Sequence, residues 1–274
     1  MKIFKFLLIA LLIAGSISLN AKEEKIVIDG STTVGPIAKA FAEYYMKLNP
    51  DVNITVSESG SGNGAKSLIN GSCQIATMSR LLKGNEYEAA VSSEVLPVTH
   101  VVALDGLAVI VHPSNPLKGL TMDQIKAIYT GQITNWSKVG GPNTGIIIIS
   151  RDTNSGTYET FETRVLKGEK IVKTCEYVGS SGAIRQRVQS TPNALGYVGI
   201  GFIDKTVKAI EVNAVGPSFE TVKKGTYPIA RPLYMVTNDY PRMGSHLYQF
   251  VTLYLTKKGQ EIIEEVGFIP VTAY

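Results

Sequence analysis

The chain has 274 residues, of which 44% are hydrophobic and 18% charged, and its formal net charge is +4. This length suits two lobes of about 100–150 residues each, and the composition excludes a disordered chain. The small charge, with no basic stripe, argues against a nucleic-acid binder. With 3 His and 2 Cys there is little to build a zinc or iron–sulfur site, so no metal and no cofactor is expected. Beyond the N-terminus no apolar run is long enough to span a membrane, which excludes a multispanning protein.

The N-terminus has the order of a secretory signal peptide. Lys2 and Lys5 precede an apolar stretch over residues 6–14 and a small, polar-leaning tail over residues 15–21. The apolar stretch is shorter than a membrane span, although an uncleaved anchor remains the alternative. No Cys lies near the cleavage region, which argues against a lipoprotein. We therefore expect a signal peptide over residues 1–21, cleaved after Ala21, and a periplasmic mature protein.

The mature chain alternates predicted strands and helices. Pro36 suits the first turn of a helix, and Thr121 suits a helix cap. Four consecutive isoleucines over residues 146–149 are typical of a strand buried on both faces. In chain order, the predicted strands cover residues 25–28, 52–56, 101–111, 146–149 and 195–202. The predicted helical segments begin at Pro36 and cover residues 65–69, 121–129, 157–166 and 180–189, the last with its preceding loop. Repeated strand–loop–helix units predict an α/β fold with mainly parallel sheets.

Three strand-to-helix junctions are rich in hydroxyl side chains and glycine, over residues 30–33, 59–64 and 151–157. A helix N-terminus presents free backbone N–H groups, glycine lets the backbone approach a ligand, and hydroxyls add donors. Arg151 offers a planar, bidentate donor to an oxyanion. Any one junction is compatible with an ordinary cap and turn. Three together, one with an arginine, predict an anion site in a shared cleft, although none has the spacing of a Walker loop.

Four segments, taken in order, resemble one family. They are residues 30–80, residues 129–141 (YTGQITNWSKVGG), residues 150–161 (SRDTNSGTYETF) and residues 191–202 (TPNALGYVGIGF). Together they resemble the periplasmic phosphate-binding proteins of bacterial phosphate ABC transporters, over nearly the whole mature chain. The resemblance implies an α/β, two-lobed type II periplasmic-binding-protein fold with a ligand cleft between the lobes. Residues 22–112 and 226–274 would form lobe 1, and residues 113–225 would form lobe 2.

The resemblance also implies a set of phosphate ligands. They are Thr32, Thr33, Ser61, Ser79, Arg151, Ser155, Gly156 and Thr157. Ser79 stands where some family members have an aspartate that accepts a proton from the bound phosphate. Because a hydroxyl does not repel a fully ionised anion as a carboxylate does, the preference for phosphate over sulfate is left open. Arg80 is either a second charged donor or a surface residue, and Asp152 either orients Arg151 or caps the next helix.

The expected function is therefore capture, without catalysis. A monomeric solute-binding protein would hold inorganic phosphate in the cleft and deliver it to the membrane permease subunits of an ABC transporter, with no nucleic-acid partner. One alternative is a binding protein for another tetrahedral oxyanion, such as sulfate, molybdate or tungstate. The other is a secreted phosphate-ester hydrolase, for which the chain has no metal cluster and no Gly-x-Ser-x-Gly motif.

The histidines and cysteines are scattered along the chain. His100, His112 and His246 are far apart in sequence, which does not exclude a triad formed in space, but a structural role is expected for each. Cys73 and Cys175 fall in different expected lobes. We expect two free thiols, because a bridge across a closing cleft would restrain the hinge, although export makes a disulfide chemically permissible.

Overall fold

The computed structural model describes residues 24–272. The signal peptide expected over residues 1–21 lies outside the described residues. No helix among those described has both the length and the apolar character that crossing a membrane requires.

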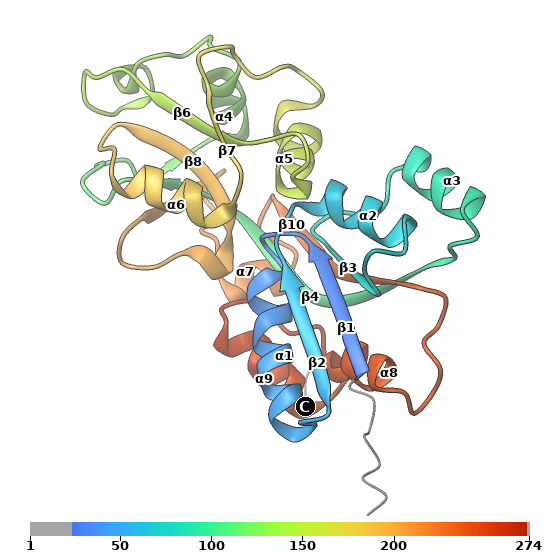
Figure 1. The fold of residues 1–274 in the computed structure, drawn as a ribbon. Coiled ribbons are helices and arrows are strands. Elements are labelled where there is room, and N and C mark those ends of the chain that lie inside the picture. Colours follow the sequence, from blue (N-terminus) through green and yellow to red (C-terminus); the bar gives the residue numbers. More distant parts are fainter. Residues whose placement is uncertain (1–23, 273–274) are drawn as a thin grey trace, which may run out of the picture.

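One path of hydrogen-bonded strands runs through the molecule, in the order β2-β1-β3-β10-β4-β8-β6-β7 (Figure 1). The short β5 pairs with β9, and β9 pairs with β4. The strands on the main path are β1 (Glu24–Gly30), β2 (Val52–Ser57), β3 (Ile75–Met78), β4 (Pro97–Val111), β6 (Ile147–Arg151), β7 (Glu176–Val178), β8 (Ala194–Gly199) and β10 (Ala230–Asn238). The two strands off this path are β5 (Gly119–Leu120) and β9 (Lys208–Val212).

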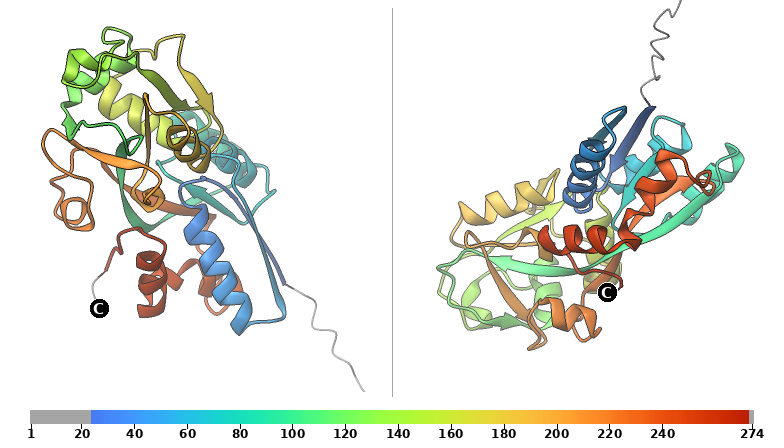
Figure 2. Two further views of the ribbon diagram at one scale, coloured as in Figure 1. Left: turned by 90° about the vertical axis from the view of Figure 1, so that its left-hand side faces the viewer. Right: turned by 90° about the horizontal axis from the view of Figure 1, so that it is seen from below.

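Helices cover both faces of these strands. They are α1 (Gly35–Leu48), α2 (Ser61–Ile69), α3 (Gly84–Ser92), α4 (Met122–Tyr129), α5 (Gly156–Phe161), α6 (Ser181–Gln189), α7 (Phe219–Lys223), α8 (His246–Val251) and α9 (Lys257–Glu265). Helix α1 packs with α8 and α9 beside β1 and β2, whereas α2 packs on β1 and β3. The chain's first and last segments, blue and red, lie side by side, whereas α4, α6, β6, β7 and β8 lie at the other end of the molecule (Figures 1 and 2).

The long strand β4 belongs to both groups of strands. Its residues from Pro97 to Gly106 pair with β10, and its residues from Leu107 to Val111 pair with β8. The expected lobe division, 22–112 plus 226–274 against 113–225, stays a prediction. Under that division, the last residues of β4 leave lobe 1 and join the sheet of lobe 2 before residue 113.

The prediction of mainly parallel pairing is right for the outer strands and wrong for the middle of the path. Strand β1 pairs in parallel with β2 and β3, and β6 pairs in parallel with β7 and β8. The neighbouring strands β10 and β4 run antiparallel to each other and to β3 and β8. The physical reason lies in the chain path, because β4 carries the chain out of the first group and β10 brings it back alongside.

Local signals in the sequence set several element ends. Pro36 lies in the first turn of α1, and the Thr121 hydroxyl accepts the Gln124 amide and caps α4. The helix predicted over residues 157–166 is interrupted, because α5 ends at Phe161 and a π-helical turn follows over Glu162–Leu166. The stretch predicted as a loop before residue 65 is already helical, since α2 begins at Ser61.

Candidate anion-binding site

Polar side chains from both groups of strands meet where strands end and helices begin. Strands β1, β2 and β3 contribute from one group, and β6 and β7 contribute from the other. The expected ligands that carry side chains are at most 4% exposed: Thr32, Thr33, Ser61, Ser79, Arg151, Ser155 and Thr157. Buried hydroxyls and a buried guanidinium therefore lie at one place between the two groups.

Hydroxyl groups make the contacts across this junction. The Thr33 Oγ1 lies 2.9 Å from the Thr157 Oγ1, and these residues come from different groups of strands. The Ser181 Oγ, at the start of α6, lies 3.3 Å from the Thr33 Oγ1 and 3.4 Å from the Thr32 Oγ1. A hydroxyl both donates and accepts, so such a cluster can turn its donors toward an anion.

Arg151 supplies positive charge to this cluster. Its Nη2 donates to the Gly179 carbonyl over 2.8 Å and its Nε to the Val178 carbonyl over 3.3 Å, which fixes the plane of the guanidinium. Its Nη1 then reaches the hydroxyls of Thr32, at 2.9 Å, and Ser181, at 3.3 Å. In the described part of the chain no carboxylate forms a salt bridge with Arg151. Burial lowers the pKa of Arg151 from its ordinary high value, so an anion that restores charge balance is favoured here.

Gly156 lets the two groups of strands approach closely. A Cβ atom added at Gly156 would lie 2.6 Å from the Ser61 Oγ and 2.7 Å from the Ser79 Oγ, too close for either. These two hydroxyls are 3.3 Å apart, and the Ser61 Oγ also accepts the Ser79 amide over 3.1 Å. Ser155 caps α5, because its Oγ accepts the amides of Thr157 and Tyr158. The structure thus brings all eight expected ligands into one cluster.

Three further residues, which were not predicted from the sequence, join the cluster: Asp105, Ser181 and Arg231. Ser181 lies at a fourth junction with the same glycine and serine composition as the other three, so its signal was available. Asp105 and Arg231 lie inside the strands β4 and β10, and the available signal was a lone charge within an apolar stretch. Burial raises the pKa of Asp105, and the Arg231 charge opposes that rise.

Arg80 and Asp152 lie beside the cluster in roles that are now clear. The Arg80 Nε lies 2.6 Å from a Glu159 carboxylate oxygen, and its Nη1 lies 2.7 Å from Glu86. Its side chain is 9% exposed, so Arg80 is neither a free donor to the site nor a surface residue. The Asp152 Oδ1 accepts the Asn154 amide over 2.8 Å and shapes the turn before α5. It does not cap that helix, because the N-cap is Ser155, and among the described contacts it forms no hydrogen bond or salt bridge with Arg151, so neither expected role fits.

The histidines and cysteines lie apart from the cluster. His100 bonds Thr237, His112 bonds Ser114 and His246 bonds Tyr45. Both cysteines are buried and free. Within residues 24–272 no three His, Cys, Asp or Glu side chains gather as metal ligands.

The fold and the cluster define a class: a two-lobed solute-binding protein whose buried hydroxyls and arginine lie between its lobes. Three comparisons agree with this class. The model of the PBP superfamily domain matches residues 18–257. The chain is 33% identical over 282 residues to the phosphate-binding protein PstS of Borreliella burgdorferi, covering 97% of this chain and 98% of the relative. It is 32% identical over 266 residues to PstS of Pseudomonas aeruginosa, covering 89% and 82%.

Solved structures give the same result. A Clostridium perfringens substrate-binding protein assigned to a phosphate ABC transporter, solved with bound phosphate, superposes with a TM-score of 0.84 at 35% identity, covering 91% of this chain and 100% of that chain. An ABC-type phosphate transport receptor from Vibrio cholerae gives 0.73 at 32% identity, covering 89% and 99%. The chain belongs to the PBP superfamily and, within it, to the family of the bacterial phosphate-binding proteins.

Proposed function

We propose that this protein captures inorganic phosphate between its two lobes and delivers it to an ABC transporter for uptake. The observation that carries the proposal is the buried Arg151, which faces hydroxyls from both groups of strands and has no carboxylate partner among the described residues. Relatives that are 32–33% identical to this chain are named phosphate-binding proteins, and one similar structure holds phosphate.

In this proposal the lobes are residues 22–112 with 226–274 and residues 113–225, and phosphate replaces the contacts that the clustered hydroxyls make with one another. Thr32 and Thr33 donate from lobe 1, Thr157 donates from lobe 2, and Arg151 pairs with the phosphate oxygens. Hydrogen bonds to a charged group in such a buried place stabilise by about 1.5–3 kcal/mol each. Closure around the anion would distinguish the loaded protein from the empty one at the permease.

The test is calorimetric titration of ligand-stripped protein with phosphate and then sulfate, each at two pH values. We expect phosphate to bind, and Arg151→Ala to weaken it at least tenfold, which corresponds to about 1.4 kcal/mol. Arg185→Gln is the matched control, because Arg185, on α6, forms a half-exposed pair with Asp204 and no hydrogen bond with a described residue of the cluster. Equal affinity in wild type and Arg151→Ala would contradict the role of Arg151, and no phosphate binding by the wild type would contradict the function.

Another tetrahedral oxyanion is the second candidate, and Ser79 is the observation that favours it. A site without a carboxylate at this position does not repel sulfate, molybdate or tungstate as an aspartate would. Competition of each anion against phosphate, followed by the shift in unfolding temperature, separates the two functions.

The cellular setting belongs to the same proposal. We infer a periplasmic monomer that hands phosphate to membrane permease subunits and has no catalytic activity. Mass spectrometry of the exported protein should find that residues 1–21 have been removed and that Lys22 is the first residue. Steady turnover of a chromogenic phosphate ester by the pure protein would contradict the absence of catalysis.

A further inference from the structure

A second buried arginine lies behind the site. Arg231 is on β10, and its side chain is 3% exposed. Its Nε and Nη2 lie 3.0 and 2.9 Å from the same oxygen of Asp105, on the neighbouring strand β4. The other carboxylate oxygen of Asp105 accepts the Ile200 amide over 2.9 Å. The ion pair is therefore fixed on both sides, and the orientation of the guanidinium follows from it.

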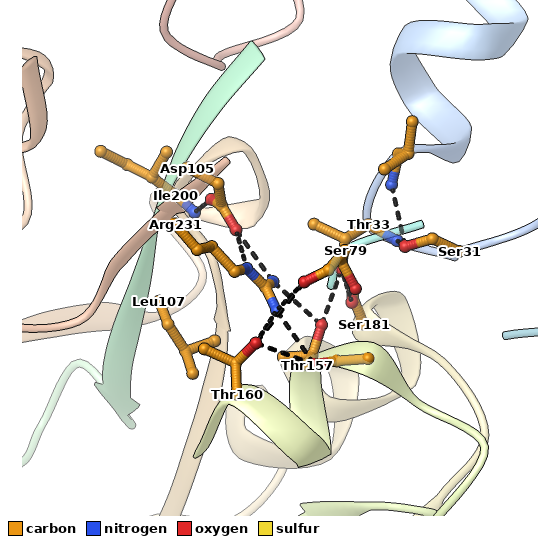
Figure 3. A network of polar contacts seen from close by, with 12 residues as sticks. Ser31, Thr33, Ser79, Asp105, Leu107, Thr157, Thr160, Ser181, Ile200 and Arg231 are labelled. Atoms are coloured by element: carbon orange, nitrogen blue, oxygen red, sulfur yellow. Dashed lines mark hydrogen bonds and ion pairs between the residues drawn. The ribbon is translucent and has the colours of Figure 1, made fainter. Parts of the chain in front are cut away.

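The same guanidinium reaches the first turn of α5 (Figure 3). The Arg231 Nη2 donates to the Thr157 Oγ1 over 3.0 Å, and Nη1 donates to the Thr160 Oγ1 over 3.3 Å. Nη1 also lies 3.3 Å from the backbone carbonyl oxygen of Ser79. Arg231 thus connects its partner Asp105 and Ser79 with a helix of the other expected lobe.

The contact with Thr157 decides which way its hydroxyl proton points. A guanidinium only donates, so the Thr157 oxygen accepts from Arg231 and its single proton must point elsewhere. The neighbour on that other side is the Thr33 Oγ1, 2.9 Å away, in the centre of the cluster. Because one lone pair of the Thr157 oxygen is occupied by Arg231, its proton is free to point toward Thr33 and the anion position.

Arg151 does the same at the other end of the cluster. Its Nη1 donates to the hydroxyls of Thr32 and Ser181, so their protons also point away from the arginine. Two arginines on opposite sides therefore align the hydroxyls between them as donors. Of these two arginines, Arg151 forms no salt bridge with a carboxylate in residues 24–272, whereas Asp105 pairs with Arg231.

We propose that Arg231 is a positioning residue for the anion site: held by Asp105, it orients the Thr157 hydroxyl as a donor and fixes the start of α5 against Ser79. The inference rests on the proposed function, because it concerns the same site. Its consequence is that Arg231 raises anion affinity through Thr157, without touching the anion.

A double-mutant cycle tests this coupling. Removing Arg231 alone would leave Asp105 buried and unpaired, which is strongly destabilising, so the pair is replaced together as Asp105→Asn/Arg231→Met. We expect this variant and Thr157→Val each to weaken phosphate at least fivefold in calorimetric titration. Combined, they should be no more than about twofold weaker than Thr157→Val alone, because the hydroxyl that Arg231 orients is already gone. If Arg231 has a purely structural role, the fold losses in phosphate affinity of the two variants should multiply in the combined variant. That result would overturn the inference, and so would unchanged affinity in Asp105→Asn/Arg231→Met.

A second variant keeps the test available if the first one does not fold. In Arg231→Lys the single ammonium group that pairs with Asp105 cannot also hold the Thr157 hydroxyl in the fixed geometry of a guanidinium. We therefore expect a smaller loss of phosphate affinity than in the double replacement, with the same coupling to Thr157→Val. Affinity equal to wild type in Arg231→Lys, or multiplying factors, would contradict the inference here too. Arg185→Gln is again the control. The same cycle is run with sulfate, so a wild type that binds sulfate and not phosphate refutes the proposed function while the coupling is still measured.

Discussion

The ion pairs of Glu159 connect the two expected lobes, and Glu159→Gln should weaken their closure. Glu159 is on α5 of lobe 2, and its carboxylate lies 2.6 Å from the Arg80 Nε and 2.9 Å from the Lys83 Nζ, both from lobe 1. The side chains of Arg80 and Glu159 are 9% and 14% exposed, whereas Lys83 is 47% exposed. Exposed pairs contribute about 0.2–1 kcal/mol, and breaking a fully buried pair costs about 3–5 kcal/mol. A loss of about 1–2 kcal/mol in the free energy of closure lies between these limits.

That loss should appear as phosphate affinity and leave folding almost unchanged. Arg80 keeps its bidentate contact with Glu86, at 2.7 and 2.8 Å, within its own lobe. If only the closed form binds tightly, about 1.4 kcal/mol of closure corresponds to a tenfold weaker apparent affinity. Calorimetric titration at low and high salt measures this, and the difference between wild type and variant should shrink as salt screens the Lys83 pair.

The control for this experiment is Glu220→Gln, which removes an exposed ion pair between a residue of α7 and Lys224, the residue that follows this helix. It should leave phosphate affinity unchanged. Phosphate affinity of Glu159→Gln within twofold of wild type at low salt would show that this contact does not stabilise the closed form, and the reasoning would fail.

Two further predictions follow from burial. Gly156→Ala places a Cβ 2.6 Å from the Ser61 Oγ, so overpacking of about 1–3 kcal/mol should weaken phosphate affinity at least fivefold. Gly84→Ala is the control, because Gly84 is also the first residue of a helix but its added Cβ would have nothing within 4 Å, so phosphate affinity should not change. Equal effects of the two substitutions would refute the steric argument. Burial raises the pKa of Cys73 and of Cys175 to about 12, so iodoacetamide at pH 8 should label neither thiol in the native protein and both after unfolding, as counted by mass spectrometry. The stability that these thiols contribute is complete below pH 9.0, their ordinary pKa, and is lost as the pH rises toward about 12; native labelling at pH 8 would contradict their burial.

The features predicted from sequence are those whose signals are local. Pro36 and Thr121 fix helix starts by their own chemistry, and the isoleucines before Arg151 form a buried strand. The hydroxyl-rich junctions also follow from neighbouring residues, because a strand end and a helix start are adjacent in the chain. Their composition also predicted that three such junctions share one anion site, whereas the two-lobed fold that brings them together was implied by the family resemblance.

The features that sequence did not predict depend on residues far apart in the chain. Asp105 and Arg231 are 126 positions apart, and they meet because β10 returns antiparallel beside β4. The interruption of the predicted helix at Phe161 also depends on a residue far away in the chain. Phe161 stacks on Tyr197 at 4.0 Å between ring centroids, so packing against a distant strand accompanies the change from an α-helix to a π-helical turn.

The orientation of the hydroxyls also bears on which anion the site prefers. Arginines hold the Thr32, Ser181 and Thr157 hydroxyls as donors, and a site made only of donors would favour sulfate, which carries no proton at neutral pH. Hydrogen phosphate carries one proton and needs an acceptor. Among the described hydroxyls of the cluster, the Ser79 Oγ bonds only the Ser61 Oγ and receives no arginine hydrogen bond. Ser79 can therefore turn to accept that proton. The position for which the family resemblance implies an aspartate in some members thus still offers an acceptor for hydrogen phosphate, without the charge that would exclude sulfate.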